Sequence, residues 1–120
     1  MAWMLVLMGC GDVPTELILR DRSSAGTYTV STEAAPLRQG EDVVPLFIES
    51  AGEPALGLRV EVEAWMDEMA HAHAEAEAEE LGEGDYAVPL LFTMAGAWTL
   101  SGALDDGLHV ERFSLRVEVR

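Results

Sequence analysis

The sequence predicts an all-β fold, an antiparallel β-sandwich of six or seven strands. Two observations lead to this prediction. Apolar and polar residues alternate with a period of two along most of the chain after residue 26, and turns rich in Gly, Pro and Asp separate these runs at regular intervals. No stretch has the strand, helix, strand order of a parallel sheet. The length of 120 residues gives room for one such domain.

The first three predicted strands show the alternation most directly. In residues 27–33 the inward positions are Tyr28, Val30 and Thr32. Residues 41–49 are apolar on both faces and contain Pro45, which predicts a kink or a sheet edge. In residues 58–66 the alternation is clearest, with inward positions at Leu58, Val60, Val62, Ala64 and Met66 and outward positions at Arg59, Glu61, Glu63 and Trp65.

Residues 71–80, HAHAEAEAEE, are compatible with two structures. Strict alternation predicts an edge strand with His71, His73, Glu75, Glu77 and Glu79 on one face, where their charges discourage aggregation. Alanine and glutamate are also good helix formers. We expect the strand, because the flanking elements are strands and a compact sandwich needs this connection to cross back.

The remaining strands complete the sandwich. One runs from Tyr86 to Met94, and the preceding GEGD resembles the turn that places a tyrosine at a sandwich corner. Gly96 ends that strand, and the next carries Trp98, which we expect to fill the core. After a tight turn at residues 105–107, the apolar positions change parity, which predicts a bulge near Arg112. This number and spacing of strands is typical of an immunoglobulin-like sandwich.

The N-terminal residues have the features of an export signal. Residues 1–9 are uncharged and apolar, and LMGC at residues 7–10 resembles a bacterial lipobox, whose cysteine is lipidated and becomes the mature N-terminus. We therefore expect residues 1–9 to be removed, Cys10 to carry lipid, residues 10–25 to form the tether, and residues 26–120 to form the domain. This places the protein on the outside of a membrane, periplasmic or extracytoplasmic. The alternative is a free buried or reactive thiol.

Composition and motifs exclude several classes of function. A net charge of −15 repels nucleic-acid phosphates and anionic headgroups, so no nucleic-acid partner is expected. The single cysteine rules out an internal disulfide. The chain has no G-x-S-x-G elbow, no Gly-rich phosphate loop and no H-E-x-x-H helix, and we expect no enzyme.

The segment WMDEMAHAH, residues 65–73, predicts a metal site. Met66 and Met94 extend the inward positions of two strands at their C-terminal ends, and a return strand between them makes both run the same way. Met69 and His71 lie in the connection that leaves this pole. Thioethers and imidazole together suit Cu(I), which is soft. Alternatively, the HAHAEAE run, including His73, holds Cu(II) or Zn(II), or the methionines are packing residues.

The same residues resemble a known family. The long segment from GTYTVSTEAAPLRQGEDVV to AWMDEMAHAH, followed by GEGDYAV, FTMAGAWTLSGAL and FSLRVEV, is similar to the YtkA-like domain of bacterial exported proteins, which is related to FixH. The family has a Met-Pro-x-Met-Gly-His segment, which corresponds here to residues 66–71 with Asp67 and Ala70 as departures. Its Met-x-Gly-x-Trp segment corresponds to residues 94–98.

The resemblance implies a membrane-attached extracytoplasmic sandwich linked to copper handling or terminal-oxidase assembly. Together with the residues, it gives the leading hypothesis of a lipid-anchored domain that binds copper through Met66, Met69, His71 and Met94. Such a domain would pass copper to a membrane partner such as an oxidase or a copper transporter. The rival hypothesis is a metal-free interaction module on the cell envelope, in which the acidic face contacts another protein.

Overall fold

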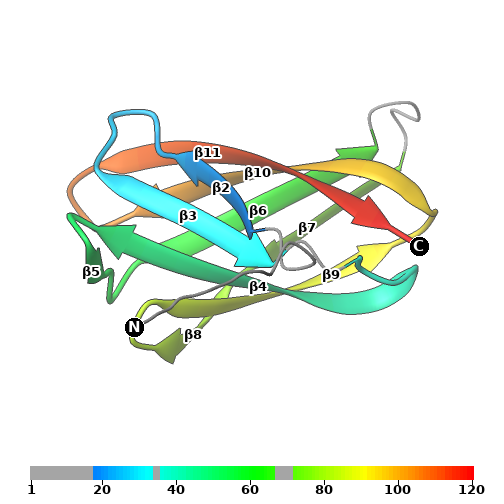
Figure 1. Cartoon of the computed structure of the whole chain (residues 1–120), viewed down its shortest axis with the longest axis horizontal. Helices are drawn as coiled ribbons and strands as arrows, with labels where there is room; N and C mark the ends of the chain where they lie inside the picture. The colour runs from blue at the N-terminus through cyan, green and yellow to red at the C-terminus, as the bar shows by residue number, and fades with distance from the viewer. Residues whose placement is uncertain (1–17, 34–35, 67–71) are drawn as a thin grey trace, which may run out of the picture.

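The protein is a β-sandwich of two antiparallel sheets. A computed structural model describes residues 18–33, 36–66 and 72–120, and all regular structure in these residues is strand (Figure 1). One sheet has the strand order β11 (Val110–Val119), β10 (Gly96–Asp105), β6 (Arg59–Met66), β7 (His73–Glu77). The other has the order β2 (Ile18–Arg22), β3 (Tyr28–Glu33), β4 (Gly40–Ser50), β9 (Asp85–Phe92), β8 (Glu79–Gly82), with β5 (Glu53–Pro54) paired to β4. The predicted fold class is confirmed.

The strands number ten in the described residues, against the six or seven predicted. Three differences account for this. β2 and the two-residue β5 were not anticipated, and the segment predicted as one strand at residues 71–80 contributes to both β7 and β8. The chain changes sheets near Ala78, because β7 pairs with β6 whereas β8 pairs with β9. The prediction of a strand rather than a helix for this segment is confirmed, and both strands lie at sheet edges.

The predicted inward positions form the core. The largest fully buried side chains are Trp98, Tyr86, Phe92, Leu46, Ile48, Leu100 and Leu104, with five valines. Trp98 is 0% exposed and meets Phe92 edge to face, with ring centroids 5.2 Å apart. The Tyr86 hydroxyl, also buried, donates to the carbonyl of Ala55 at 3.0 Å and accepts from the N–H of Leu58 at 3.2 Å. As in the tyrosine corner known from other β-sandwiches, this tyrosine ties the connection before β6 to the start of β9.

Pro45 lies where the pairing between β3 and β4 has ended. The β3–β4 ladder covers Tyr28 to Ser31, and beyond it the Thr32 hydroxyl donates to the carbonyl of Pro45 at 2.5 Å. Because the N and C=O of one strand residue point to the same side, the ring nitrogen of Pro45 also faces β3, where no ladder donor is required. The predicted sheet edge is wrong, because β4 is an inner strand between β3 and β9; Pro45 lies instead where β4 has lost its pairing with β3 on one side.

The predicted tether needs correction at its C-terminal end. Residues 18–22, placed in the tether between Cys10 and the domain, form β2 and pair with β3 from Ile18↔Glu33 to Arg22↔Thr29. The sequence of this strand, ILRDR, is too short and too charged to show a period of two, which is why the pattern did not reveal it. Among the described residues, no helix is long and apolar enough to cross a membrane.

The predicted bulge near Arg112 is wrong. β11 pairs with β10 in one unbroken register from Gly96↔Val119 to Asp105↔Val110. The parity of the strand is constant, and the position that broke the apolar pattern is Glu111, which points inward and is only 8% exposed. Val110 and Leu108, which suggested the opposite parity, are exposed.

Glu111 is buried because the β2–β3 turn supplies its hydrogen bonds. The Ser23 hydroxyl donates to Glu111 Oε1 at 2.5 Å, and the Thr27 N–H donates to the same oxygen at 3.3 Å. The Ser23 oxygen in turn accepts from the N–H of Tyr28 at 2.9 Å. These bonds, that from Ser23 above all, favour the ionised carboxylate and hold the pKa of Glu111 below its ordinary value of 4.5. The carboxylate therefore fastens the β2–β3 turn to β11.

Glu111 makes folding stability depend on pH in a defined direction. A pKa that is lower in the folded than in the unfolded state contributes stability above the unfolded value of 4.5, and this contribution disappears as pH falls through the folded value. The variant Glu111→Gln keeps an oxygen acceptor for Ser23 but does not titrate. We expect its melting temperature to lie furthest below that of the parent at neutral pH and to approach it in acid. A melting series from pH 7 to 3 tests this, and a constant difference between the two proteins would contradict it.

Candidate functional site

Met66 lies at the C-terminal end of β6, on the inner face of its sheet. It pairs with Trp98 of β10 and is 6% exposed. Its terminal methyl lies against Gly96, so close that a Cβ built on this glycine would be 2.6 Å from Met66 Cε. Gly96 also has a φ of +139°, a conformation that side-chain-bearing residues rarely adopt. Glycine at this position therefore leaves room for the Met66 methyl beside a half-exposed backbone.

Met94 lies at the same end of the molecule, in the connection of residues 93–95 between β9 and β10. Its carbonyl accepts a hydrogen bond from the Trp98 indole N–H at 2.9 Å, and the residue is 37% exposed. The prediction that Met94 continues the inward face of a strand is wrong, because β9 ends at Phe92. After the strand end the backbone turns, and the parity of the preceding residues no longer decides where a side chain points.

The two strand ends nonetheless meet where the sequence placed them. β6 and β9 run in the same direction through the two sheets (Figure 1). Trp98 connects them, because its backbone pairs with Met66 and its indole ring binds the carbonyl of Met94. Both methionine-bearing segments are therefore bonded to one buried tryptophan. We call this arrangement of Met66, Met94, Gly96 and Trp98 the methionine pole.

Three predicted site residues lie outside the described residues. These are Met69 and His71, in the connection between β6 and β7, and Cys10, the predicted lipidation site. The connection departs from Met66 and returns at Ala72, whose carbonyl accepts from the Met66 N–H at 3.2 Å. Both ends of the segment that contains Met69 and His71 are therefore fixed beside the methionine pole.

His73 lies on the opposite face of the sheet from Met66. It pairs with Trp65, and its side chain points outward with those of Glu75 and Glu77. Its Nε2 is 3.9 Å from a carboxylate oxygen of Glu63 and 3.8 Å from one of Glu75. One ligand atom from each of these three exposed residues lies within 4.8 Å of the others. His73 is thus separated from the methionine pole, as expected for a residue on the solvent face.

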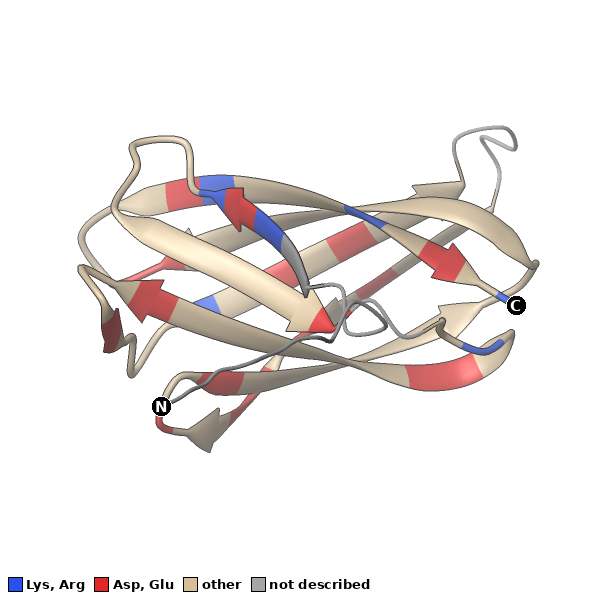
Figure 2. Ribbon diagram, viewed as in Figure 1, with Lys and Arg blue, Asp and Glu red and all other residues tan. Residues whose placement is uncertain are grey.

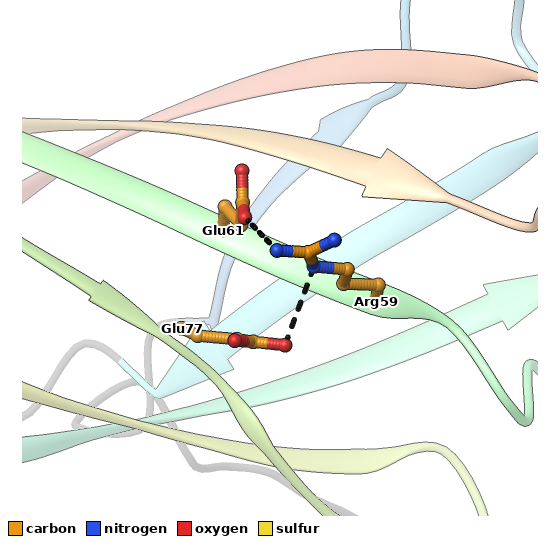
Figure 3. A network of polar contacts seen from close by, with 3 residues as sticks. All are labelled: Arg59, Glu61 and Glu77. Carbon is orange, nitrogen blue, oxygen red and sulfur yellow. Dashed lines mark ion pairs between the residues drawn. The ribbon is translucent and has the colours of Figure 1, made fainter.

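The sequence analysis did not anticipate Glu63 as a neighbour of His73. Glu63 was predicted to point outward from its strand, but only the register between β6 and β7, which pairs Glu63 with Glu75, shows that the three side chains are close. The register pairs Glu61 with Glu77 in the same way. Arg59 partly offsets this second pair, since its guanidinium is 2.8 Å from Glu61 and 3.5 Å from Glu77 (Figure 3).

The two groups of residues have different coordination chemistry. Thioethers at the methionine pole are soft, neutral donors that suit Cu(I). The imidazole and carboxylates of His73, Glu63 and Glu75 are harder donors that suit Zn(II) or Cu(II), and such acidic groups are common on surfaces without any ion. The third histidine, His109, lies exposed in the turn between β10 and β11, apart from both groups.

Comparison with known proteins gives one match. A sequence model of the YtkA-like family matches residues 21–102, which run from β2 into β10 and include both methionines of the pole. No curated protein matches the chain, and no solved structure does.

The contact between Met66 and Gly96 predicts a response to substitution. We expect Gly96→Ala to lower the free energy of unfolding by about 1–3 kcal/mol, the cost of a strained backbone conformation, and to move the Met66 methyl. The control is Gly57→Ala, at a φ of +74° but with open space around the new Cβ. In methyl NMR spectra the Met66 signal should shift in the first variant only. An unmoved Met66 signal in Gly96→Ala would contradict the contact.

Proposed function

The chain belongs to the YtkA-like family, and from this premise we propose that it is a lipid-anchored extracytoplasmic domain that binds Cu(I) at the methionine pole. The observation that carries the proposal is the position of Trp98, which holds the segments of Met66 and Met94 together. Met69 and His71 are the further ligands expected from the sequence. The bound copper is cargo, passed to a membrane partner such as an oxidase or a copper transporter, and the protein itself performs no catalysis.

The residues fit a soft ion in both chemistry and access. Thioethers remain ligands in oxidising compartments, where free thiols are easily lost. Met94 is 37% exposed and lies outside the core, so an incoming ion can reach this residue without rearrangement of the core. Met66 is buried, but its methyl lies against Gly96, a residue without a side chain whose backbone is half exposed. Met66, at the end of a strand, would be a fixed sulfur donor, and Met94, in an exposed connection, would be an accessible one.

The proposed anchor would keep the start of β2 close to the membrane. Cys10 is eight positions before Ile18, where β2 begins, so the intervening chain can span at most about 29 Å. The net charge of −15 disfavours direct contact of the domain with anionic headgroups. The short tether would hold the domain near other proteins of the same membrane, and its negative charge would keep it off anionic lipid. Both features favour transfer of copper to a protein partner over adsorption of the domain to the lipid.

Copper binding is tested with a soluble variant, Cys10→Ser, so that the thiol cannot bind the ion itself. Dialysis under reducing conditions against a competing Cu(I) chelator should show binding that Met69→Leu abolishes and that Met66→Leu, Met94→Leu and His71→Ala each weaken by about tenfold or more. Leucine conserves volume, and such swaps cost less than about 1.5 kcal/mol of stability, so loss of the fold would not explain the result.

The control for copper binding is His109→Ala, which should bind as the parent does. A parent that retains no Cu(I) would contradict the proposal and favour the metal-free interaction module. If binding is lost only when His71 and His73 are both removed, with the methionine variants intact, the ligands are those of the outer face and the metal is Cu(II) or Zn(II).

Lipid anchoring is tested separately in cells. Several acyl chains hold a lipoprotein firmly, whereas a chain without them has no comparable attachment. We expect Cys10→Ser to leave the membrane fraction, or to remain unprocessed with residues 1–9 still present, as judged by fractionation and intact mass. Unchanged mass and membrane retention would contradict the anchor without bearing on copper binding.

A further inference from the structure

The side of β7 that faces away from β6 has no backbone partner in the part of the chain that the structure describes. β7 is the last strand of its sheet, and its pairing with β6 is flanked by two hydrogen bonds: the Met66 N–H donates to the carbonyl of Ala72, and the Ala78 N–H donates to the carbonyl of Val60. In an antiparallel pair the hydrogen-bonded positions alternate. The backbone groups of the alanines at 74 and 76 therefore face β6.

The backbone N–H and C=O groups of His73, Glu75 and Glu77 consequently point away from β6, toward the open side. Within the described ranges, none of these groups makes a backbone hydrogen bond. An exposed strand edge of this kind is a template for one more strand.

The opposite edge of the same sheet is closed by the chain itself. On β11 the N–H and C=O of Arg112 bond to the hydroxyl and N–H of Ser24, and the Ser114 N–H bonds to Asp21. Farther along, Leu37 bonds to the carbonyl of Glu118 and to the N–H of Arg120. Among the described residues, the edge of β11 is thus covered, whereas the edge of β7 has no backbone partner on its far side.

The neighbouring edge of β9 is a poorer template. Pro45 faces β3, so its pair with Ala87 is a non-hydrogen-bonded one, and two residues farther the pair of Val43 with Pro89 is of the same kind. Pro89 therefore turns its nitrogen, which carries no hydrogen, toward the open side beyond the end of β8. The edge of β9 therefore lacks the donor at Pro89, whereas the edge of β7 has a donor at each of its open-side positions, His73, Glu75 and Glu77.

A groove runs beside the open edge. It is lined by residues 41–43 of β4, 73–75 of β7 and 89–91 of β9. Val43 and Leu91 are about half exposed, at 51% and 52%, and provide an apolar surface beside the carboxylates of Glu41 and Asp42. Backbone N–H groups of Arg38 and Val43 bind Asp42 and lower its pKa, so that it remains charged.

The negative charge around the edge of β7 indicates that a partner segment would be basic. Figure 2 shows acidic bands along β6 and β7, and the outer face of these strands carries Glu61, Glu63, Glu75 and Glu77. Glu61 and Glu77 share Arg59, whereas Glu63 and Glu75 have only His73 within ion-pair distance among the described residues. A second copy of the chain would set glutamates against glutamates, which is unfavourable for directly opposed residues.

We propose that the free edge of β7 receives an extended, basic segment of a partner protein as an added strand. Alternate Lys or Arg side chains of that segment would lie on the outer face beside Glu75 and Glu77. The intervening small or apolar side chains would continue the inner face, beside Ala74 and Ala76. Backbone hydrogen bonds with β7 would position the segment. Attraction to the glutamates would favour a basic segment over a neutral or acidic one. This inference does not depend on copper binding.

The test uses the Cys10→Ser chain with EDTA and a seven-residue peptide of alternating Lys and Val, blocked at both ends. On binding, amide hydrogen exchange at His73, Glu75 and Glu77 should slow by about tenfold or more, while exchange at Ala74 and Ala76, already bonded to β6, stays unchanged. The same peptide with Glu in place of Lys should not bind. Peptide binding without slower exchange at the three residues, or no binding at all, would overturn the proposal.

A matched pair of variants separates the backbone from the charge. Glu75→Gln and Glu75→Pro both remove the carboxylate, but only proline removes the N–H on the open side, and neither affects a bond to β6. We expect the proline variant to bind the peptide about tenfold more weakly than the glutamine variant. Equal affinities would overturn strand addition. Circular dichroism checks the fold, and if Glu75→Pro does not fold, Glu77→Gln and Glu77→Pro form the same pair.

Discussion

The register of β6 between its two neighbours decides where each candidate group in this molecule lies. On one side it pairs Met66 with Trp98, and on the other it pairs Trp65 with His73 and Glu63 with Glu75. Successive side chains of a strand point to opposite faces, so a shift of one residue would expose Met66 and bury glutamates. Burial of the inward residues of β6 therefore fixes the soft donors on the inner face and the hard donors on the outer face.

Much of the fold was predictable because a period of two and burial are tightly linked. The inward positions of β3, β6 and β9 were assigned correctly, since one face of each strand contacts the core. The failures have a common physical cause. Glu111 is an inward charge whose hydrogen-bond partners, Ser23 and Thr27, are more than 80 positions away in the chain. A local pattern cannot show such a partner, and a bulge was the only local explanation for the polar position.

The candidate site was predictable in part for the same reason. The parity of β6 placed Met66 correctly at an inward strand end, but the parity of β9 could not place Met94, because the strand ends two residues before it. The proximity of Glu63 to His73 depends on the register between two strands, and a sequence contains little information about register before the strands are paired. Sequence thus predicts the residues of the site better than their grouping.

The outer face of β6 and β7 carries opposed like charges that destabilise the fold. Two glutamate pairs, Glu61 with Glu77 and Glu63 with Glu75, face each other across non-hydrogen-bonded positions, where side chains come closest and like charges repel. One arginine and one histidine offset them in part. Their charge protects the edge of β7, which no described residue covers, against pairing with copies of the same chain. It also leaves a local excess of negative charge that an added basic strand would neutralise, so the feature that prevents aggregation is the one that selects a partner.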